Sequence, residues 1–313
     1  MVVYDFEFDG KTLSSFNMVM CSFGEKGLET ISNGSQTTFN TVSTLGGQKH
    51  HLMSSTYDTC LEATFQICKK SCSGKDMEIS SVEFRQLTKW LSRKHFLKFK
   101  LLSEEYIDIY YEIKFDISRI EINGKLYGLE LTAQTNRPFA LKEPVIKIIQ
   151  TTIFVWERFK VVNGKKDEYT KINVKSRNRK RYPDNGVAED GYYYVYIEEK
   201  KEFDNKHFID DISHEEGYIY PHTEIVVNQN GDLTIHNAIE NRDTIIKNCV
   251  AGEVITMDYP VITSSISSHR IQNDFNWNFF RIANTFDNSR NDINVSIPCS
   301  IKIKYSPVVK VGL

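Results

Sequence analysis

The sequence of 313 residues lacks the cysteine patterns by which a metal site or a disulfide framework is recognised. None of its six cysteines forms the Cys-x-x-Cys pair that is typical of zinc sites, and their spacing follows no regular interval. Buried free thiols are therefore favoured over disulfides or a metal site, and we expect neither a metal nor another cofactor. The cysteines are Cys21, Cys60, Cys68, Cys72, Cys249 and Cys299.

The sequence also has no long apolar run, and its first residues do not have the pattern of a signal peptide. No stretch has the length of apolar sequence that spans a bilayer, and the first nine residues alternate acidic and apolar side chains without a basic region. We therefore expect a soluble protein that is made in a cytoplasm, with no secretion signal and no membrane insertion. A formal net charge of -2 provides no general attraction to nucleic acid or to anionic membranes.

The common catalytic motifs are absent. The sequence contains no Gly-x-Ser-x-Gly elbow, no phosphate-binding P-loop and no Gly-x-Gly-x-x-Gly that opens a helix. In the segment from His214 on, Tyr218 takes the place of the second histidine of a zinc protease. A nearby group of carboxylates could supply a glycosidase pair, but it lies in a polar connector, where we expect solvated groups whose pKa nothing raises. We therefore expect no enzyme; these carboxylates are Asp210, Asp211, Glu215 and Glu216.

The clearest positive pattern is a short helix. With 40% hydrophobic residues, the chain can fill the cores of two domains. Ser80-Ser81-Val82-Glu83 has the form of a capping box, which begins a helix. Apolar residues then recur every three to four positions, as in a helix that buries one face. We predict that this helix docks on a sheet through Phe84, Leu87, Trp90 and Leu91.

A long alternation of apolar and polar residues follows the helix and predicts strands. Ile107–Ile117 forms a long strand, and Tyr127–Ala133 forms the strand that returns beside it. Asn123-Gly124 between them predicts a type I′ hairpin turn, because both positions tolerate positive φ. The apolar phase slips at the end of the first strand, so we expect a bulge or bend near Ser118 and Arg119.

The other segments of the first 139 residues predict further strands and loops. Together with the helix, they indicate a β-sandwich or barrel-like domain. We expect strands at Tyr4–Phe8, Phe16–Phe23, Thr56–Cys68 and Leu97–Leu101, a turn at Asp9-Gly10, loops joined by short strands from Gly24 to Leu52, and a loop at Ser71–Lys75.

Residues 157–181 are strongly basic, with ten Lys and Arg side chains. Such a run can bind phosphate. Only Phe159 and Tyr169 interrupt its charges, however, whereas proteins that bind single-stranded nucleic acid interleave more aromatic residues. The acidic stretch Glu189–Glu216 offers the run a partner within the chain or in a neighbouring subunit. We therefore expect an inter-subunit electrostatic contact or a solvated loop, and no specific nucleic-acid binding.

Two turn signals beyond the basic run carry tyrosines, at Tyr182–Gly186 and Asp190–Tyr194. Aromatic rings beside polar loop residues can stack on sugars and hydrogen-bond them. Tyr192, Tyr193 and Tyr194 are therefore possible glycan contacts. The alternative, which we favour, is a protruding hairpin whose tyrosines pack on the domain beneath it.

The last hundred residues predict an antiparallel β-sandwich, because several short strands alternate with turn residues. The segments on either side of Asn230-Gly231 predict a two-residue hairpin. Gly252–Asp258 predicts another strand, and Ile301–Tyr305 predicts the closing one. The aromatic segment Asp274–Phe280 precedes a final hairpin, which we expect to turn near residues 287–291.

The order of these features resembles the siphophage distal tail protein family. In the first part of the chain, the resemblance rests on an aromatic strand ending in Asp9-Gly10, a helix ending in Trp90-Leu91, the long hairpin and Arg137-Pro138-Phe139-Ala140. In the last part, it rests on the Asn-Gly turn, the strand Gly252–Asp258, the aromatic loop and the closing strand. The last part is similar to the galectin-like C-terminal domain of that family.

This resemblance implies a mainly β protein of two domains with one short helix. Residues 1–139 would form a ring domain that assembles as a hexamer, and residues 140–313 a galectin-like sandwich with an insertion at about 157–212. The protein would be a structural part of the virion tail, assembled in the cytoplasm of the bacterial host. Its ring would join the tail tube protein to a hub protein of the tail tip or baseplate, around a lumen for the tape measure protein and then DNA.

Within such a ring, we expect the long hairpin to pair with a neighbour's strand edge by β-augmentation. The predicted interface residues are Ile107, Ile109, Tyr111 and Ile113. A conduit for DNA should repel phosphate, so the acidic positions of the same strand are candidates to face the lumen, although a plain solvent-exposed face is slightly favoured. These positions are Asp108, Glu112 and Asp116.

The alternative function is a lectin-like adhesion module that recognises host cell-wall glycans. Trp277 would stack on a sugar, while His236, Asn237 and Arg281 would hydrogen-bond it. Because phenylalanines flank Trp277, we expect its ring in the core rather than on the surface. A galectin-like fold alone does not establish sugar binding.

Overall fold

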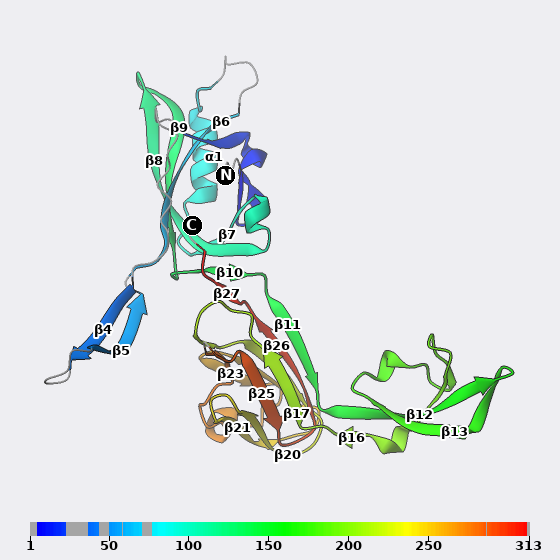
Figure 1. The fold of residues 1–313 in the computed structure, drawn as a ribbon. Helices are drawn as coiled ribbons and strands as arrows, with labels where there is room; N and C mark the ends of the chain where they lie inside the picture. Colours follow the sequence, from blue (N-terminus) through cyan, green and yellow to red (C-terminus); the bar gives the residue numbers. More distant parts are fainter. Residues whose placement is uncertain are drawn as a thin grey trace. The chain divides into compact units, whose positions relative to one another are not determined.

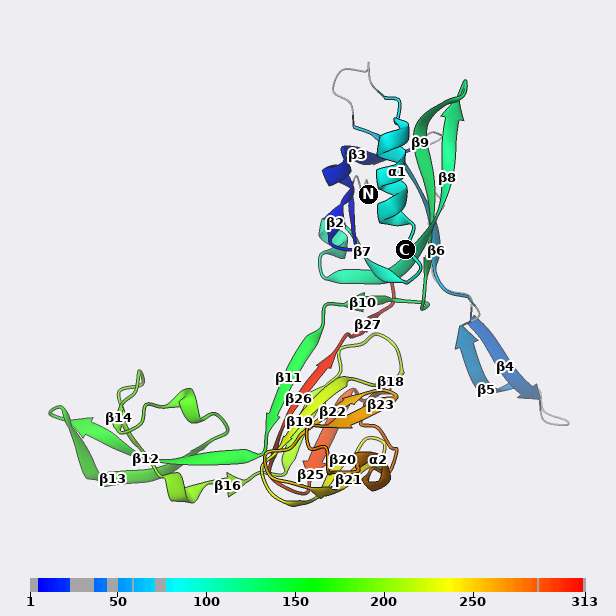
Figure 2. The ribbon, with the colours of Figure 1, turned by 180° about the vertical axis from the view of Figure 1, so that it is seen from behind.

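The computed structural model describes residues 5–22, 37–43, 50–57, 59–70, 77–285 and 287–311. Strands dominate, so the predicted mainly β fold is confirmed (Figures 1 and 2). The described residues contain the predicted helix, α1 (Ser81–Leu91), and a second short one, α2 (Ile271–Asp274). The chain divides into unit 1, which runs to Glu143 and resumes at Pro307, and unit 2, Pro144–Ser306.

A nine-stranded antiparallel sheet forms the framework of unit 1. Its main path runs β2-β1-β7-β8-β9-β6-β3, and β10 pairs with β8 and with the C-terminal strand β27. The strands are β1 (Phe6–Phe8), β2 (Lys11–Thr12), β3 (Met18–Cys21), β6 (Glu62–Lys69), β7 (Leu97–Leu101), β8 (Ile109–Ile122), β9 (Lys125–Thr135), β10 (Ala140–Lys142) and β27 (Val308–Val309).

Helix α1 begins with the predicted capping box. The Ser80 hydroxyl accepts the Glu83 amide at 3.3 Å, and the Glu83 carboxylate accepts the Ser80 amide at 2.8 Å. At the other end of the helix, the Trp90 ring is 2% exposed, stacks on Phe16 with centroids 4.3 Å apart, and donates its N–H to the Phe8 carbonyl at 2.9 Å. The helix is therefore fixed to the sheet through its C-terminal turn.

The β8–β9 hairpin turns at Asn123-Gly124, where φ is +52° and +75°, as the type I′ prediction requires. The predicted bulge is present but lies closer to the turn. Ser118 and Arg119 keep regular partners on β9, and the register shifts only between Ile120 and Glu121. The phase slip is thus absorbed beside the turn, where fewer side chains are buried.

The turn makes a first prediction. Replacing Gly124 by alanine should lower the free energy of unfolding of unit 1 by about 1–2 kcal/mol, because a Cβ disfavours positive φ. No atom lies within 4 Å of the added Cβ, so the loss would report backbone strain and not a clash. Gly186→Ala is the control, because Gly186 has no positive φ and its Cβ would meet Pro183 only at an ordinary 3.6 Å. Urea titration of both variants tests the difference; equal effects would contradict the assignment.

Several predicted strands of unit 1 have different bounds. Phe16 belongs to a 3-10 helix, Leu13–Phe16, so the second strand starts only at Met18, while Tyr4, Phe23 and the loop Ser71–Lys75 lie outside the described residues. The predicted single strand Thr56–Cys68 is two strands. Its start belongs to β5 (His50–Tyr57), which pairs with β4 (Thr37–Ser43) in a separate two-stranded sheet, in a region where short strands joined by loops were expected. The exposed residues Thr59 and Cys60 lie between β5 and β6, outside both strands.

Unit 2 contains the predicted sandwich, built from two antiparallel sheets. Ile225, Ile255 and Ile301 from one sheet and Ile235 and Ile246 from the other are at most 2% exposed and share one core. One sheet consists of β11 (Val145–Gln150), β26 (Cys299–Tyr305), β19 (His222–Val227), β22 (Val254–Asp258) and β23 (Val261–Ser264); the other consists of β17 (Lys206–Asp210), β25 (Arg290–Val295), β20 (Gly231–Asn237) and β21 (Arg242–Cys249).

Two predicted hairpins of the sandwich are wrong, and for the same reason. The strands around Asn230-Gly231, β19 and β20, lie in different sheets, so this turn carries the chain across the sandwich. Near the predicted final hairpin, a tight turn at Thr285–Asn288 follows β24 (Ile282–Asn284), but β24 pairs with β18 (Gly217–Ile219). A turn signal specifies a local reversal and not which sheet receives each strand.

The basic run forms a hairpin rather than a loop. We call β12 (Thr152–Val162) and β13 (Lys165–Ser176) the basic hairpin; they turn at Asn163-Gly164, where φ is +50° and +74°. Asn163-Gly164 is the local sequence signal for this hairpin, since both positions tolerate positive φ. The hairpin belongs to a sheet of its own, completed by β15 (Tyr193–Tyr196), β14 (Gly186–Val187) and β16 (Glu202–Phe203).

Candidate interaction surfaces

The four residues predicted for the ring interface do not share a surface. Tyr111 and Ile113 are 1% and 0% exposed and belong to the core of unit 1, whereas Ile109 is half-buried and Ile107 is exposed. Burial raises the pKa of the Tyr111 phenol well above its usual range. In this fold, only Ile107 of the four is open to a neighbour.

The strand that carries them does have an open edge elsewhere. β8 pairs with β9 along one side and, on the other side, with β10 and β7 as far as Ile113. No strand in the described part of the chain pairs with that second side from Lys114 to Ile122. Unpaired backbone donors and acceptors on such an edge are ready to accept a further strand.

The predicted lumen-facing carboxylates lie among cations. Asp108 and Asp116 are exposed, but Glu112 is paired with Arg137 at 2.9 Å. Lys114 stands between Glu112 and Asp116 on the same side of β8. The strand face is therefore of mixed charge, which is what a plain solvent-exposed face would show.

The tyrosines predicted as glycan contacts pack within the sheet of the basic hairpin. Tyr194 is 1% exposed, stacks on Tyr182 with centroids 4.1 Å apart and donates its hydroxyl to Asp190 at 2.7 Å. Burial, and then the Asp190 carboxylate, raise the pKa of Tyr194 to about 12. The Tyr193 hydroxyl donates to the Asn185 carbonyl, and the Arg158 guanidinium lies over Tyr192. Tyr194 in particular offers no free ring face.

The basic hairpin is partly neutralised within the chain. Lys175 pairs with Glu202, and Arg177 pairs with Asp204, each at 2.5 Å. The fold also brings tyrosines to the arginines of the run, so the scarcity of aromatic residues noted in the sequence is only local: Arg158, Arg179 and Arg181 lie over the rings of Tyr192, Tyr196 and Tyr182. Among the described residues, no carboxylate lies within ion-pair distance of Lys160, Lys165 or Lys180.

Trp277 is exposed, contrary to the expectation that it lies in the core. Its ring is 57% exposed, whereas its neighbours Phe275, Phe279 and Phe280 are at most 5% exposed. The cause is the Asn276 side chain, which accepts from Ile245 N–H and donates to the Asp243 carbonyl, and so fixes the loop with Trp277 at its tip. Trp277 has φ of +60°, which bulky residues rarely adopt.

Trp277 ends a line of ring contacts that we call the aromatic row. It comprises Trp277, Phe279, Tyr259, Tyr220 and Tyr218, with centroids of successive rings 6.4, 5.3, 4.2 and 5.6 Å apart. At its far end, the Arg281 guanidinium lies 4.0 Å from the Tyr218 centroid. The row crosses three separate segments, so it exists only in the folded unit.

The polar residues of the predicted sugar site are occupied by other partners. Asn237 is 2% exposed and donates to the Arg281 carbonyl and to Asn291. Arg281 is held by both oxygens of Glu240, which raises the pKa of its guanidinium further. His236 lies 2.7 Å from the Asp243 carboxylate. The predicted set therefore stabilises the sandwich, and only Trp277 of that set has an open ring.

One carboxylate of the connector behaves differently from the prediction. Asp211 is 5% exposed, and burial raises its pKa, although its Oδ1 accepts both the backbone N–H and the hydroxyl of Ser213. The expectation of four solvated carboxylates is therefore wrong for Asp211. The reason is that the connector lies against the sandwich, with Asn284 donating to the Ser213 carbonyl.

This burial makes a second prediction. A carboxyl with a raised pKa in the folded state costs stability as the pH rises through that pKa, because the folded state must then ionise a buried group. Asp211→Asn keeps the Oδ1 acceptor and should raise the free energy of unfolding at pH 7, on the order of 1 kcal/mol. Asp210→Asn, at an exposed site, is the control. Urea titrations at pH 4 and pH 7 measure the effect; an equal gain at both values would contradict it.

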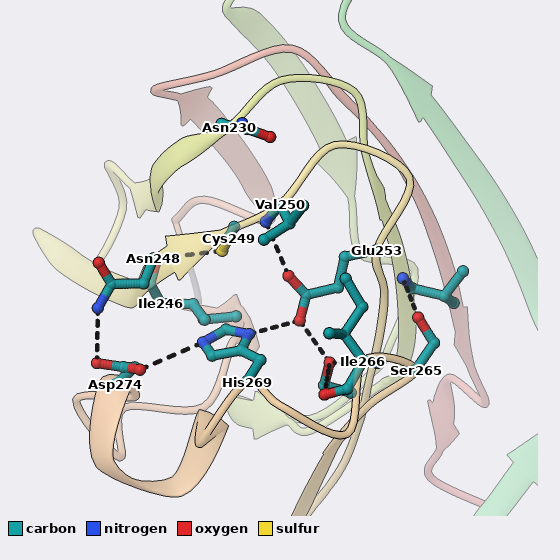
Figure 3. Close-up of polar contacts among 12 residues, drawn as sticks. Asn230, Ile246, Asn248, Cys249, Val250, Glu253, Ser265, Ile266, His269 and Asp274 are labelled. Carbon is teal, nitrogen blue, oxygen red and sulfur yellow. Dashed lines mark hydrogen bonds and ion pairs between the residues drawn. The ribbon is translucent and has the colours of Figure 1, made fainter.

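A buried polar network joins the residues just before β22, at the end of β23 and on either side of the start of α2 (Figure 3). Glu253 is fully buried and accepts from Val250 N–H at 3.0 Å, from the Ser264 hydroxyl at 2.5 Å and from His269 Nδ1 at 2.5 Å. His269 Nε2 lies 3.4 Å from the Asp274 carboxylate. Burial alone would raise the pKa of Glu253, but the hydrogen bonds from Ser264, His269 and Val250 lower it below 4.5.

The network resembles a catalytic relay only in composition. Ser264 donates to Glu253 and not to His269, so the imidazole is not placed to activate that hydroxyl. Burial raises the pKa of the nearby Cys249 thiol to about 11, which keeps it protonated and unreactive. The geometry fits a structural role, in which Glu253 fixes the loops around it.

The remaining chemical predictions concern cysteines, metals and membranes. Cys249 and Cys299 are buried free thiols, as expected, whereas Cys60 is exposed and Cys72 lies outside the described residues. Within the described ranges, no three His, Cys, Asp or Glu side chains gather as a metal site. In this part of the chain, no helix combines the length and the apolar character that are needed to cross a membrane.

Family models identify the class of protein. Residues 1–137 match the model described as "Phage tail protein N-terminal domain", and residues 194–305 match the model described as "Phage tail C-terminal domain". The two matches cover most of the chain, which therefore belongs to this family of phage tail proteins and is a component of the virion tail. The basic hairpin lies in the interval between the matched segments.

A particular solved structure shares the fold. The Dit protein of phage SPP1 is similar over 97% of this chain and 99% of its own, with a TM-score of 0.52 and 8% sequence identity. That protein is described as a paradigm of the hub adsorption apparatus in phages that infect Gram-positive bacteria. No curated protein matches the chain. The predicted resemblance to distal tail proteins is thus confirmed.

Proposed function

We propose that this protein is a distal tail protein whose copies form a sixfold ring between the tail tube and the tail tip or baseplate. The fold shared with the SPP1 Dit protein over nearly the whole chain supports this role. The observation that supports a ring is the open edge of β8 from Lys114 to Ile122. We therefore place the contact between copies on this edge and not at Tyr111 and Ile113, which are buried. Cyclic packing is heterologous, so each copy must present two different surfaces.

The proposed role is mechanical. Unit 1, as the ring domain, surrounds a lumen that passes the tape measure protein and then DNA, and it contacts the tail tube protein on one side and a hub protein on the other. Unit 2 forms the galectin-like domain. Assembly takes place in the bacterial cytoplasm before the tail is complete, and no catalytic step is involved.

The ring is tested by light scattering and by imaging of the full-length protein. We expect a hexamer, alone at high concentration or together with a tail partner, and particles with sixfold symmetry. A chain that stays monomeric under all these conditions, or rings of another symmetry, would contradict the proposal.

Glycan recognition is a second candidate, because Trp277 is exposed at the tip of a fixed loop. Aromatic rings of this kind can carry a sugar, although the predicted hydrogen-bonding residues are engaged elsewhere. A glycan array probed with the full-length protein and with Trp277→Ala tests it. Saturable binding that the substitution removes would support this function, and no binding to any glycan would leave only the structural role.

A further inference from the structure

Three of the five rings in the aromatic row are exposed, and unit 2 itself leaves them uncovered. Trp277, Tyr259 and Tyr218 are 57%, 55% and 57% exposed, and Arg281 lies over the last of them. Trp, Tyr and Arg are the residues that contribute most of the binding energy in protein interfaces. Several large rings exposed together indicate an interaction site more strongly than a single exposed ring would.

The backbone conformation of Trp277, at the tip of the row, also indicates an interaction site. A positive φ at a bulky residue is unfavourable, and it is retained at Trp277 because Asn276 fixes the loop on β21. The result of this conformation is an indole held in solvent beside three buried phenylalanines. Binding of a partner that covers the ring would be favoured by burial of this apolar surface, which stays in water in the folded chain alone.

Charge indicates what kind of partner fits. Unit 2 without residues 152–206 carries 13 Asp and Glu against 8 Lys and Arg. Exposed Asp258 and Glu216 stand close in sequence to the row tyrosines Tyr259 and Tyr218. The row therefore lies in an acidic environment and favours a cationic partner. The face of Tyr218 already accepts one cation, Arg281, so such rings can also contact lysines.

The basic hairpin and the five residues that follow it have the complementary composition. Residues 157–181 contain ten Lys and Arg against three Asp and Glu, and Lys160 and Lys165 have no carboxylate partner among the described residues. The hairpin also exposes apolar groups. Tyr169 is fully exposed where the ladder is interrupted between Asp167 and Ile172, and Ile172 itself is 44% exposed.

We propose that the basic hairpin of one copy docks on the aromatic row of a second copy. The match is one of charge and of apolar surface together, and it is heterologous, as contacts around a ring must be. The inference rests on the proposed assembly of copies around an axis and adds a contact between their second units. Electrostatic attraction of this kind should weaken as salt is added.

The test uses two full-length variants, each with one surface altered. The hairpin variant carries Lys160→Glu, Lys165→Glu and Tyr169→Ala; the row variant carries Asp258→Lys and Trp277→Ala. All five side chains are exposed, so both proteins should fold. A control variant, Lys302→Glu with Lys304→Glu, changes two exposed lysines on the outer face of the five-stranded sheet.

Trp277 provides the measurement, because the other two tryptophans, Trp90 and Trp156, are at most 2% exposed. Acrylamide quenching of the Trp277 fluorescence should fall at least twofold when the wild-type chain or the control variant assembles. This decrease should be smaller at high salt. In the hairpin variant, acrylamide quenching of Trp277 should not decrease. Adding an excess of the row variant, whose hairpin is intact, should restore the shielding of Trp277 in the hairpin variant.

The possible failures are distinguishable. If the wild-type chain forms a hexamer in which Trp277 remains accessible to acrylamide, this inference is wrong and the proposed ring still stands. That holds even if another tail protein covers the row. Equal shielding in the hairpin variant and the wild type, or shielding by a neutral oligosaccharide in place of a second copy, would also overturn it. A strictly monomeric wild-type chain would contradict both the ring and this contact.

Discussion

Trp90→Ala should lower the free energy of unfolding of unit 1 by about 3–5 kcal/mol, the cost typical of deleting a buried aromatic side chain. The ring packs against Phe6, Phe8 and Phe16, and the substitution also leaves the Phe8 carbonyl without its 2.9 Å donor. Such a loss is a large part of the stability of an ordinary domain. We expect ring assembly to fail with it, since an unfolded unit 1 has no β8 edge.

The measurement is a urea titration followed by circular dichroism, alongside light scattering. Val82→Ala on the same helix is the matched control, because Val82 is 60% exposed and its loss should change stability by less than about 0.5 kcal/mol. A Trp90→Ala protein as stable as the control would show that α1 is not fixed to the sheet as described.

Glu253→Gln should have the second large effect, a loss of about 3–5 kcal/mol in unit 2, as is usual when one partner is removed from a buried charged network. Both oxygens of Glu253 accept donors, Val250 N–H on one side and Ser264 and His269 on the other. A glutamine loses the charge and keeps only one acceptor oxygen, so its NH2 group either faces Val250 N–H or forces Ser264 and His269 to accept instead of donate. The exposed Glu216→Gln is the control.

The same variant predicts a pH dependence. The pKa of Glu253 is lowered in the folded state, so its stabilising contribution is complete above about pH 4.5 and is lost as the pH falls through the folded value. The difference in unfolding free energy between the wild type and Glu253→Gln should therefore shrink below pH 4.5. Urea titrations from pH 3 to pH 7 measure this; a difference that grows on acidification would contradict the proposed role.

Local patterns in the sequence were sufficient for helix α1 and for the β8–β9 hairpin of unit 1. The capping box at Ser80, the alternation along β8 and the turn at Asn123-Gly124 each depend on residues that are neighbours in the chain. The same logic failed at Asn230-Gly231, because the assignment of β19 and β20 to different sheets depends on distant strands. The type of a turn can be predicted locally, whereas sheet membership cannot.

The candidate surfaces were harder to predict. Trp277 was expected in the core because its neighbours in sequence are phenylalanines, and hydrogen bonds of Asn276 to β21 reverse that outcome. Asp211 appeared polar and solvated, yet the fold buries it. The aromatic row joins rings from positions 218 to 279, and no single stretch of sequence contains that set.

The return of the chain to unit 1 affects how the protein bears force. Because β27 pairs with β10 after unit 2 is complete, the two units are joined by two covalent strands and not by one. A protease that cuts either connector would leave unit 2 tethered by the other. Tension applied to unit 2 is likewise divided between two points of attachment along the chain.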